Sequence, residues 1–137
     1  MARILGIDYG ERRLGLAVSD PGQVIAQPLT TLVREKSGGW WEQLAVIIAE
    51  QKIEAIVVGY PLTLGGLPSR QTETVDRFIR TLQDRATVPI HSFDERLTSV
   101  AAKKALIQQG IKTGHRKGEV DRTAAAIMLQ DYLDSTR

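Results

Sequence analysis

The stretch GIDYGERRLGLAVSD, residues 6–20, carries the pattern that decides the fold. An apolar run ends in Asp8, a turn containing Gly10 follows, and a second apolar run begins at residue 13. Two short apolar runs joined by a glycine-containing turn are typical of a β-hairpin. An aspartate just before a turn glycine often only shapes the turn. Whether Asp8 serves the turn or a chemical site therefore depends on what the rest of the chain brings to it.

The composition is that of a globular chain. Its 137 residues, 42% of them hydrophobic, have the size of one compact domain. We expect a single domain over residues 1–137. The absence of cysteine excludes a disulfide framework and a thiolate zinc site. The sequence has no signal-type start and no apolar run of membrane-spanning length, so we expect a cytoplasmic protein with no membrane partner.

Beyond the hairpin, the apolar pattern changes from three short strands to alternating helices and strands. Short turns require antiparallel neighbours, whereas a helix between two strands favours a parallel pair. The predicted fold class is α/β, a mixed five-stranded sheet flanked by helices, with three antiparallel N-terminal strands and then alternating helices and parallel strands. The expected strands cover residues 3–8, 13–18, 24–30, 55–60 and 88–93. One helix is expected to begin near residue 38, and three more are expected at residues 74–85, 98–109 and 119–134.

The strands at 3–8, 55–60 and 88–93 are predicted to be parallel, so their carboxyl ends meet at one edge of the sheet, where ligands bind in such folds. If the strand at 55–60 lies in the middle, Asp8 and the acids of FDER, residues 93–96, lie two strand spacings apart, about 10 Å. The longer Glu95 spans that gap better than Asp94, although strand parity alone leaves both acids open.

A third acid, Asp121, begins the last predicted helix. Asp121 shares a helical stripe with Ala125, Met128 and Tyr132, at spacings i, i+4, i+7 and i+11. A carboxylate on an apolar stripe is costly to bury unless it is paired or coordinates a metal. Carboxylates without cysteine or histidine partners suit Mg²⁺ or Mn²⁺, and one or two such ions can activate water for phosphodiester hydrolysis. The candidate catalytic residues and metal ligands are Asp8, Glu95 and Asp121.

Positive charge gathers in the C-terminal third, where six Lys or Arg face two acids between residues 103 and 122. A solvated charge run is the ordinary interpretation, whereas a position beside a carboxylate site favours contact with nucleic-acid phosphates. Trp40 and Trp41 fall in a predicted helix, where packing is the usual role, and we predict no base-stacking surface. The candidate nucleic-acid contacts are Arg12, Arg13, Arg70, Arg96, Lys104, Arg116 and Lys117.

The opening stretch, together with IVVGYPL at 56–62, HSFDERLTSVAA at 91–102 and KGEVDRTAAAIMLQDYL at 117–133, resembles the YqgF/RuvX family. The resemblance implies a ribonuclease H-like fold and a nuclease whose catalytic acids are Asp8, Glu95 and Asp121. It implies processing of pre-16S rRNA in ribosome biogenesis, which we favour, or resolution of Holliday junctions in DNA recombination and repair. Tyr60 departs from the family pattern, in which leucine is more common.

Two other classes of protein fit parts of the sequence. Actin-like ATPases share the GID-G hairpin, but they need a second domain of the same kind, so this chain would be a fragment of one. A noncatalytic nucleic-acid-binding module on a degenerate nuclease fold would lack turnover, and the intact acids argue against it. The sequence leaves open whether the substrate is structured RNA or branched DNA, and whether the protein is a monomer or a homodimer.

Overall fold

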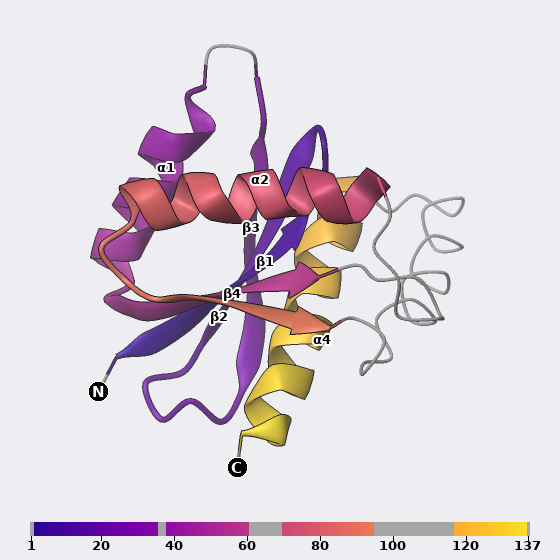
Figure 1. The fold of residues 1–137 in the computed structure, drawn as a ribbon. Coiled ribbons are helices and arrows are strands. Elements are labelled where there is room, and N and C mark those ends of the chain that lie inside the picture. The colour runs from indigo at the N-terminus through magenta and orange to yellow at the C-terminus, as the bar shows by residue number, and fades with distance from the viewer. Residues whose placement is uncertain (1, 36–37, 61–69, 95–116, 137) are drawn as a thin grey trace.

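The computed structural model describes residues 2–35, 38–60, 70–94 and 117–136, which form a five-stranded sheet with helices on both faces (Figure 1). The strand order is β3-β2-β1-β4-β5. Helices α1 and α2 cover one face and α4 covers the other. The described elements are β1 (Arg3–Tyr9), β2 (Arg13–Ser19), β3 (Ala26–Val33), α1 (Trp40–Glu50), β4 (Ile53–Tyr60), α2 (Arg70–Arg85), β5 (Ile90–Asp94) and α4 (Lys117–Ser135).

The pairing of the strands confirms the predicted mixed sheet. β1 pairs antiparallel with β2 and parallel with β4, and β4 pairs parallel with β5. β4 therefore lies between β1 and β5, as the predicted acid site requires. The carboxyl ends of all three parallel strands lie at the same edge of the sheet.

The limits of β3 differ from the predicted 24–30, because the preceding turn holds two of those residues. The Asp20 carboxylate accepts hydrogen bonds from the backbone N–H groups of Val24 and Ile25, both at 2.8 Å. β3 instead begins at Ala26 and continues to Val33. As an edge strand, β3 also accommodates Pro28, which cannot donate a ladder hydrogen bond.

The other predicted limits shift by a few residues. α2 begins at Arg70 rather than 74, and β5 covers Ile90–Asp94 rather than 88–93. The helix predicted at 98–109 lies outside the described residues. Among the helices that the structure describes, none is both long and apolar enough to cross a membrane.

Alternation along the strands divides the core into two layers. On β1, Leu5 and Ile7 pack beneath α1 and α2, whereas Ile4 packs beneath α4. The α4 layer is thin, because small residues let the helix approach the sheet. A Cβ on Gly6 would lie 2.9 Å from the Cβ of Leu129 in α4. Side chains that follow Ile4 and Gly6 at two-residue spacing therefore lie on the α4 side.

Candidate active site

Asp8 lies near the carboxyl end of β1, on the face of the sheet that α4 covers. It follows Ile4 and Gly6 in the alternation of the strand, and only 5% of its surface is exposed. Among the residues that the structure describes, Asp8 is the one buried acid. A buried carboxylate needs compensation by hydrogen bonds or positive charge. Asp8 therefore differs from an ordinary turn aspartate, because its carboxylate is buried and not solvated.

Gly15 explains how α4 reaches this part of the sheet. Gly15 is the cross-strand partner of Asp8 in the β1–β2 hairpin. A Cβ on Gly15 would lie 2.0 Å from the carbonyl oxygen of Asp121, a contact that no side chain tolerates. The backbone of Asp121 thus sits directly on the residue paired with Asp8. The structure brings these two predicted acids, 113 positions apart in sequence, to one place.

Asp121 has a partner that the sequence did not reveal. The Nε of Arg13 donates a hydrogen bond to Oδ2 of Asp121 at 2.6 Å. The Asp121 side chain is 17% exposed and the Arg13 side chain 35% exposed. Arg13 and Gly15 are two residues apart on β2, so both face α4. The pair neutralises part of the negative charge of the site and fixes one oxygen of Asp121.

The middle of the predicted apolar stripe on α4 is buried, as expected. Ala125 and Met128 are buried, and Tyr132 is half-buried against Phe93 of β5, with ring centroids 5.5 Å apart. Asp121 lies at the border of the buried face. This border position gives Asp121 contact with the sheet and with solvent.

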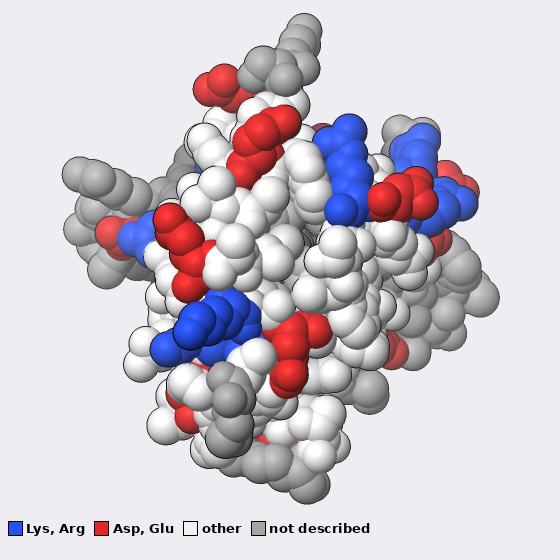
Figure 2. All heavy atoms as spheres, turned by 90° about the vertical axis from the view of Figure 1, so that its left-hand side faces the viewer, with Lys and Arg blue, Asp and Glu red and all other residues white. Residues whose placement is uncertain are grey.

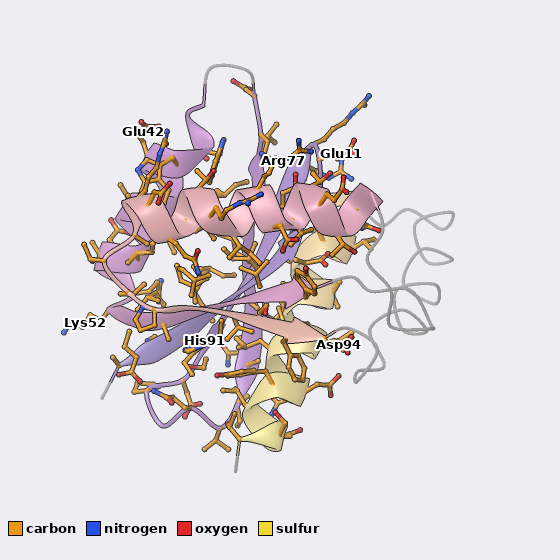
Figure 3. All side chains as sticks on the ribbon, viewed as in Figure 1. Glu11, Glu42, Lys52, Arg77, His91 and Asp94 are labelled. Atoms are coloured by element: carbon orange, nitrogen blue, oxygen red, sulfur yellow. The ribbon has the colours of Figure 1, made fainter. Side chains whose placement is uncertain are left out.

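Asp94, one of the two acids considered for the third position of the site, lies on the face of the sheet away from Asp8. Phe93 packs against Tyr132 of α4, so Phe93 is on the same face of the sheet as Asp8. Asp94, the next residue, lies at the tip of β5 (Figure 3), and the alternation of the strand assigns it to the opposite face. Glu95 lies outside the described residues. Within those residues, no group of three His, Asp or Glu side chains is placed to hold a metal ion.

The predicted nucleic-acid contacts are only partly described. Arg12 is exposed in the hairpin turn, and Arg13 is paired with Asp121. Arg70 and Lys117 are the first residues of α2 and α4, and their side chains are not described. Three predicted contacts lie outside the described residues: Arg96, Lys104 and Arg116.

The charges on the side of the molecule remote from the carboxyl ends of β4 and β5 are mixed. Figure 2 shows acidic and basic side chains in small alternating groups there, separated by uncharged residues. A nucleic-acid surface normally carries a continuous basic stripe. This side therefore has no such stripe over its described residues.

Tyr60 connects the end of β4 to α2. Its hydroxyl donates a hydrogen bond to Oδ1 of Asp76 at 2.8 Å. This bond, with some desolvation, raises the pKa of the Tyr60 phenol above its usual value. Tyr60 thus attaches α2 to the sheet. The sequence signal was the departure itself, but its partner on α2 was not predictable.

The fold is of the ribonuclease H-like class that a solved Holliday junction resolvase also has. The chain is similar to the structure of T. thermophilus RuvC in complex with a Holliday junction substrate, with a TM-score of 0.62 and 19% identity, covering 99% of this chain and 96% of that one. At this identity the likeness concerns the fold, and it confirms the predicted ribonuclease H-like architecture.

Sequence comparison then defines the family. The family model described as RuvX, Holliday junction resolvase, matches residues 2–135, and the chain belongs to this family. Relatives named "Putative pre-16S rRNA nuclease" include one from Chloroflexus aurantiacus, 44% identical, covering 98% of this chain and 88% of the relative. Another relative, from Roseiflexus sp., is 40% identical, and the match covers 98% of this chain and 96% of the relative. The predicted family is thus confirmed, and the relatives' names agree with the predicted class of activity.

Proposed function

We propose that this protein is a metal-dependent nuclease that hydrolyses phosphodiester bonds of pre-16S rRNA during ribosome biogenesis in the cytoplasm. The observation that carries the proposal is the buried Asp8 opposite Gly15, against which the backbone of Asp121 is packed. Relatives that are 40–44% identical over nearly the whole chain carry names of this activity.

The described donors fit a hard divalent cation. Asp8 and Asp121 offer carboxylate oxygens without sulfur or imidazole, which suits Mg²⁺ or Mn²⁺. Alternation on β5 places Asp94 on the other face of the sheet, so we assign the third ligand to Glu95. When bound, one or two such ions supply Lewis-acid stabilisation and lower the pKa of water.

Each described residue then has a separate task. The buried Asp8 provides a fixed negative charge at the end of β1, where desolvation strengthens its attraction for a cation. Arg13 positions Asp121 by holding one of its oxygens. Gly15 sets the distance between α4 and the hairpin. These roles account for the GERRLG sequence of the turn and the start of β2 better than hairpin formation alone.

The decisive test compares two substrates with the purified protein: a pre-16S rRNA fragment and a four-way DNA junction, each with Mn²⁺, Mg²⁺ or chelator. We expect cleavage of the rRNA fragment with metal, and its loss in Asp8→Asn. Asp84→Asn, which changes an exposed acid on α2, is the matched control and should cleave normally. Cleavage that persists in chelator or in Asp8→Asn would contradict the mechanism.

Other results would redirect the assignment. Preferential cleavage of the junction would favour the resolvase described by the family model, which needs two active sites and hence a dimer. Salt-sensitive binding without cleavage of either substrate would favour a noncatalytic module. Binding and hydrolysis of ATP would favour the actin-like alternative.

A further inference from the structure

Three depressions on the α1/α2 side of the sheet follow one another, each sharing lining residues with the next, and the acid site does not use them. The first, about 390 Å³, lies between the hairpin turn at residues 9–11 and the start of α2. The second, about 230 Å³, shares Tyr9 and Thr74 with the first and is also lined by Arg34, Arg77 and Trp40. The third, about 320 Å³, shares Trp40 and lies against β3 and α1. We call this path the arginine groove.

Arg34 sits in the middle of the arginine groove as a cation surrounded by aromatic rings. Its guanidinium carbon lies 5.0 Å from the ring centroid of Tyr9 and 5.5 Å from those of Trp40 and Phe78. Its Nη1 donates to the Tyr9 hydroxyl at 2.8 Å and to the Gly10 carbonyl at 3.3 Å. These contacts fix the orientation of the guanidinium before any ligand arrives.

Within the part of the chain that the structure describes, Arg34 has no carboxylate partner. Its Nε is buried and has no hydrogen-bond acceptor among these residues. A partly buried, pre-oriented guanidinium of this kind is complementary to a phosphate group.

Arg77 adds a second cation to the same depression. It projects from α2, is exposed, and makes no ion pair with the residues that the structure describes. Figure 3 shows Arg77 and Glu11 on the same side of the molecule, along the edge between α2 and the hairpin. The acids that line the path, Glu11 and Glu35, belong to the outer depressions. The middle depression is therefore the positive part of the groove.

We propose that the arginine groove binds a single-stranded RNA segment continuous with the strand that is cut, an inference that rests on the proposed nuclease function. Arg34 and Arg77 contact its phosphates, and the half-buried Trp40 stacks on one base. The groove begins at Tyr9, the residue after Asp8, so a strand that leaves the acid site reaches it around the hairpin turn. Trp40 packs against the core, as the sequence predicted, and the proposal adds a second role for the ring face that lines the groove.

The phosphate contact is tested by binding without metal. The probe is an end-labelled single-stranded RNA of about twelve nucleotides, and its affinity is measured by fluorescence anisotropy in EDTA at several salt concentrations. Arg77→Gln should weaken binding about tenfold and reduce the slope of log affinity against log salt by about 0.7. Arg80→Gln, an exposed arginine one turn further along α2 that does not line the groove, is the control and should change neither quantity. Equal losses in both variants would overturn the proposal.

The stacking contact is tested by tryptophan fluorescence, because the chain has two tryptophans and only Trp40 lines the groove. In Trp41→Phe, the remaining Trp40 should be quenched by the RNA. In Trp40→Phe, the remaining Trp41, which lies against Arg85 at 5.7 Å, should be unaffected. Equal quenching in the two variants would overturn the proposal, as would equal quenching of Trp40 by an acidic peptide.

The experiments can contradict the proposed RNA groove and the proposed nuclease function independently of one another. If the protein cuts no RNA but Arg77→Gln still weakens binding selectively, the proposed function fails and the groove stands. If Asp8→Asn abolishes cleavage but Arg77→Gln binds RNA like Arg80→Gln, the groove fails and the nuclease assignment stands.

Discussion

The two faces of the β1–β2 hairpin are built from opposite kinds of residue. On the α4 face, Gly6 and Gly15 let a helix backbone approach the sheet, and Asp8 and Asp121 lie together. On the α1/α2 face, aromatic rings pack around a cation. The ring centroids of Tyr9 and Phe78 lie 4.8 Å apart, and the guanidinium of Arg34 lies over both rings. Neighbouring residues of one strand, Asp8 and Tyr9, belong to these two environments.

This difference teaches how one short strand can separate two tasks. Successive side chains point to opposite faces, so a carboxylate for hydrolysis and a ring for strand binding can follow one another without competing for space. Small residues favour close backbone approach, whereas rings around arginine favour a pre-oriented cation. A change on one face should therefore leave the task of the other face intact.

The largest effect is expected from Gly15→Ala on the α4 face. Its Cβ would lie 2.0 Å from the Asp121 carbonyl oxygen, against backbone that cannot rotate away, so α4 has to shift. We expect a loss of about 3 kcal/mol in the free energy of unfolding and at least a hundredfold loss of cleavage. Urea unfolding and initial rates measure the two effects.

The control for Gly15→Ala is Gly22→Ala in the β2–β3 turn. There the nearest contact is Oδ2 of Asp20 at 3.0 Å, which needs only a small shift while Oδ1 keeps its bonds to Val24 and Ile25, so the loss should be much smaller. RNA binding by folded Gly15→Ala in EDTA should also remain near normal, because the arginine groove lies on the other face. Full cleavage activity in Gly15→Ala would show that the position of α4 does not matter to the site.

Arg13→Gln should have the next largest effect, because it removes the charged partner of Asp121 while keeping a polar side chain. We expect cleavage at saturating Mn²⁺ to fall on the order of tenfold. The Mn²⁺ concentration for half-maximal activity should decrease, since a positive charge beside the ligand is removed. Stability should change by less than about 1 kcal/mol, because the pair is partly exposed.

A matched control for Arg13→Gln is Arg122→Gln, which removes a weaker 3.6 Å pair with Glu119 on α4. It should leave the metal dependence of cleavage unchanged. An unchanged metal dependence in Arg13→Gln itself would mean that the ion pair has no role at the site.

The sequence predicted the arrangement of the sheet because short turns and helical crossovers each allow few topologies. It also placed Asp8 and Asp121 at one site, since the end of a parallel strand and a buried helical stripe are both local patterns. The assignment of Glu95 stays a prediction. The position of Asp94 on the face away from Asp8, known only from the folded strand, supports this prediction.

Contacts between distant segments could not be predicted in the same way. A glycine inside a strand pattern indicates only a weakened strand, and the reason for Gly15 lies in a helix more than 100 positions away. The Arg13–Asp121 pair joins the same distant segments. The rings around Arg34 come from β1, α1 and α2, so the sequence predicted the packing of Trp40 but not its place beside this guanidinium.

Tyr60→Phe should have a smaller effect, confined to stability and dependent on pH. The hydrogen bond to Asp76 raises the pKa of Tyr60 in the folded protein. The stabilisation from this bond is therefore fully present below the unfolded pKa of about 10, and it is lost as the pH rises through the higher pKa of the folded state. The free energy of unfolding of wild type should exceed that of Tyr60→Phe by about 0.5–1 kcal/mol at pH 8. The two free energies should converge as the pH rises above ~10. Thermal unfolding from pH 7 to 11 measures this difference.

The control is Tyr132→Phe on the α4 face, because the hydroxyl of Tyr132 makes no hydrogen bond with the described residues while its ring packs on Phe93. Its stability should match wild type at pH 8. A difference between wild type and Tyr60→Phe that stays constant up to pH 11 would show that the hydrogen bond does not hold α2.

The smallest effect is expected from Glu11→Gln in the first depression of the arginine groove. Glu11 is exposed at the hairpin turn, where its charge repels the phosphates of a strand passing from Asp8 toward Arg77. At a solvent-exposed position such repulsion is weak, so removing it should strengthen RNA binding only about twofold, and less at high salt. Glu50→Gln, an exposed acid at the end of α1 outside the groove, should leave the affinity unchanged. If Glu11→Gln and Glu50→Gln change affinity equally, the RNA responds to net charge and not to this path, and the contrast between the two faces would lose its functional meaning.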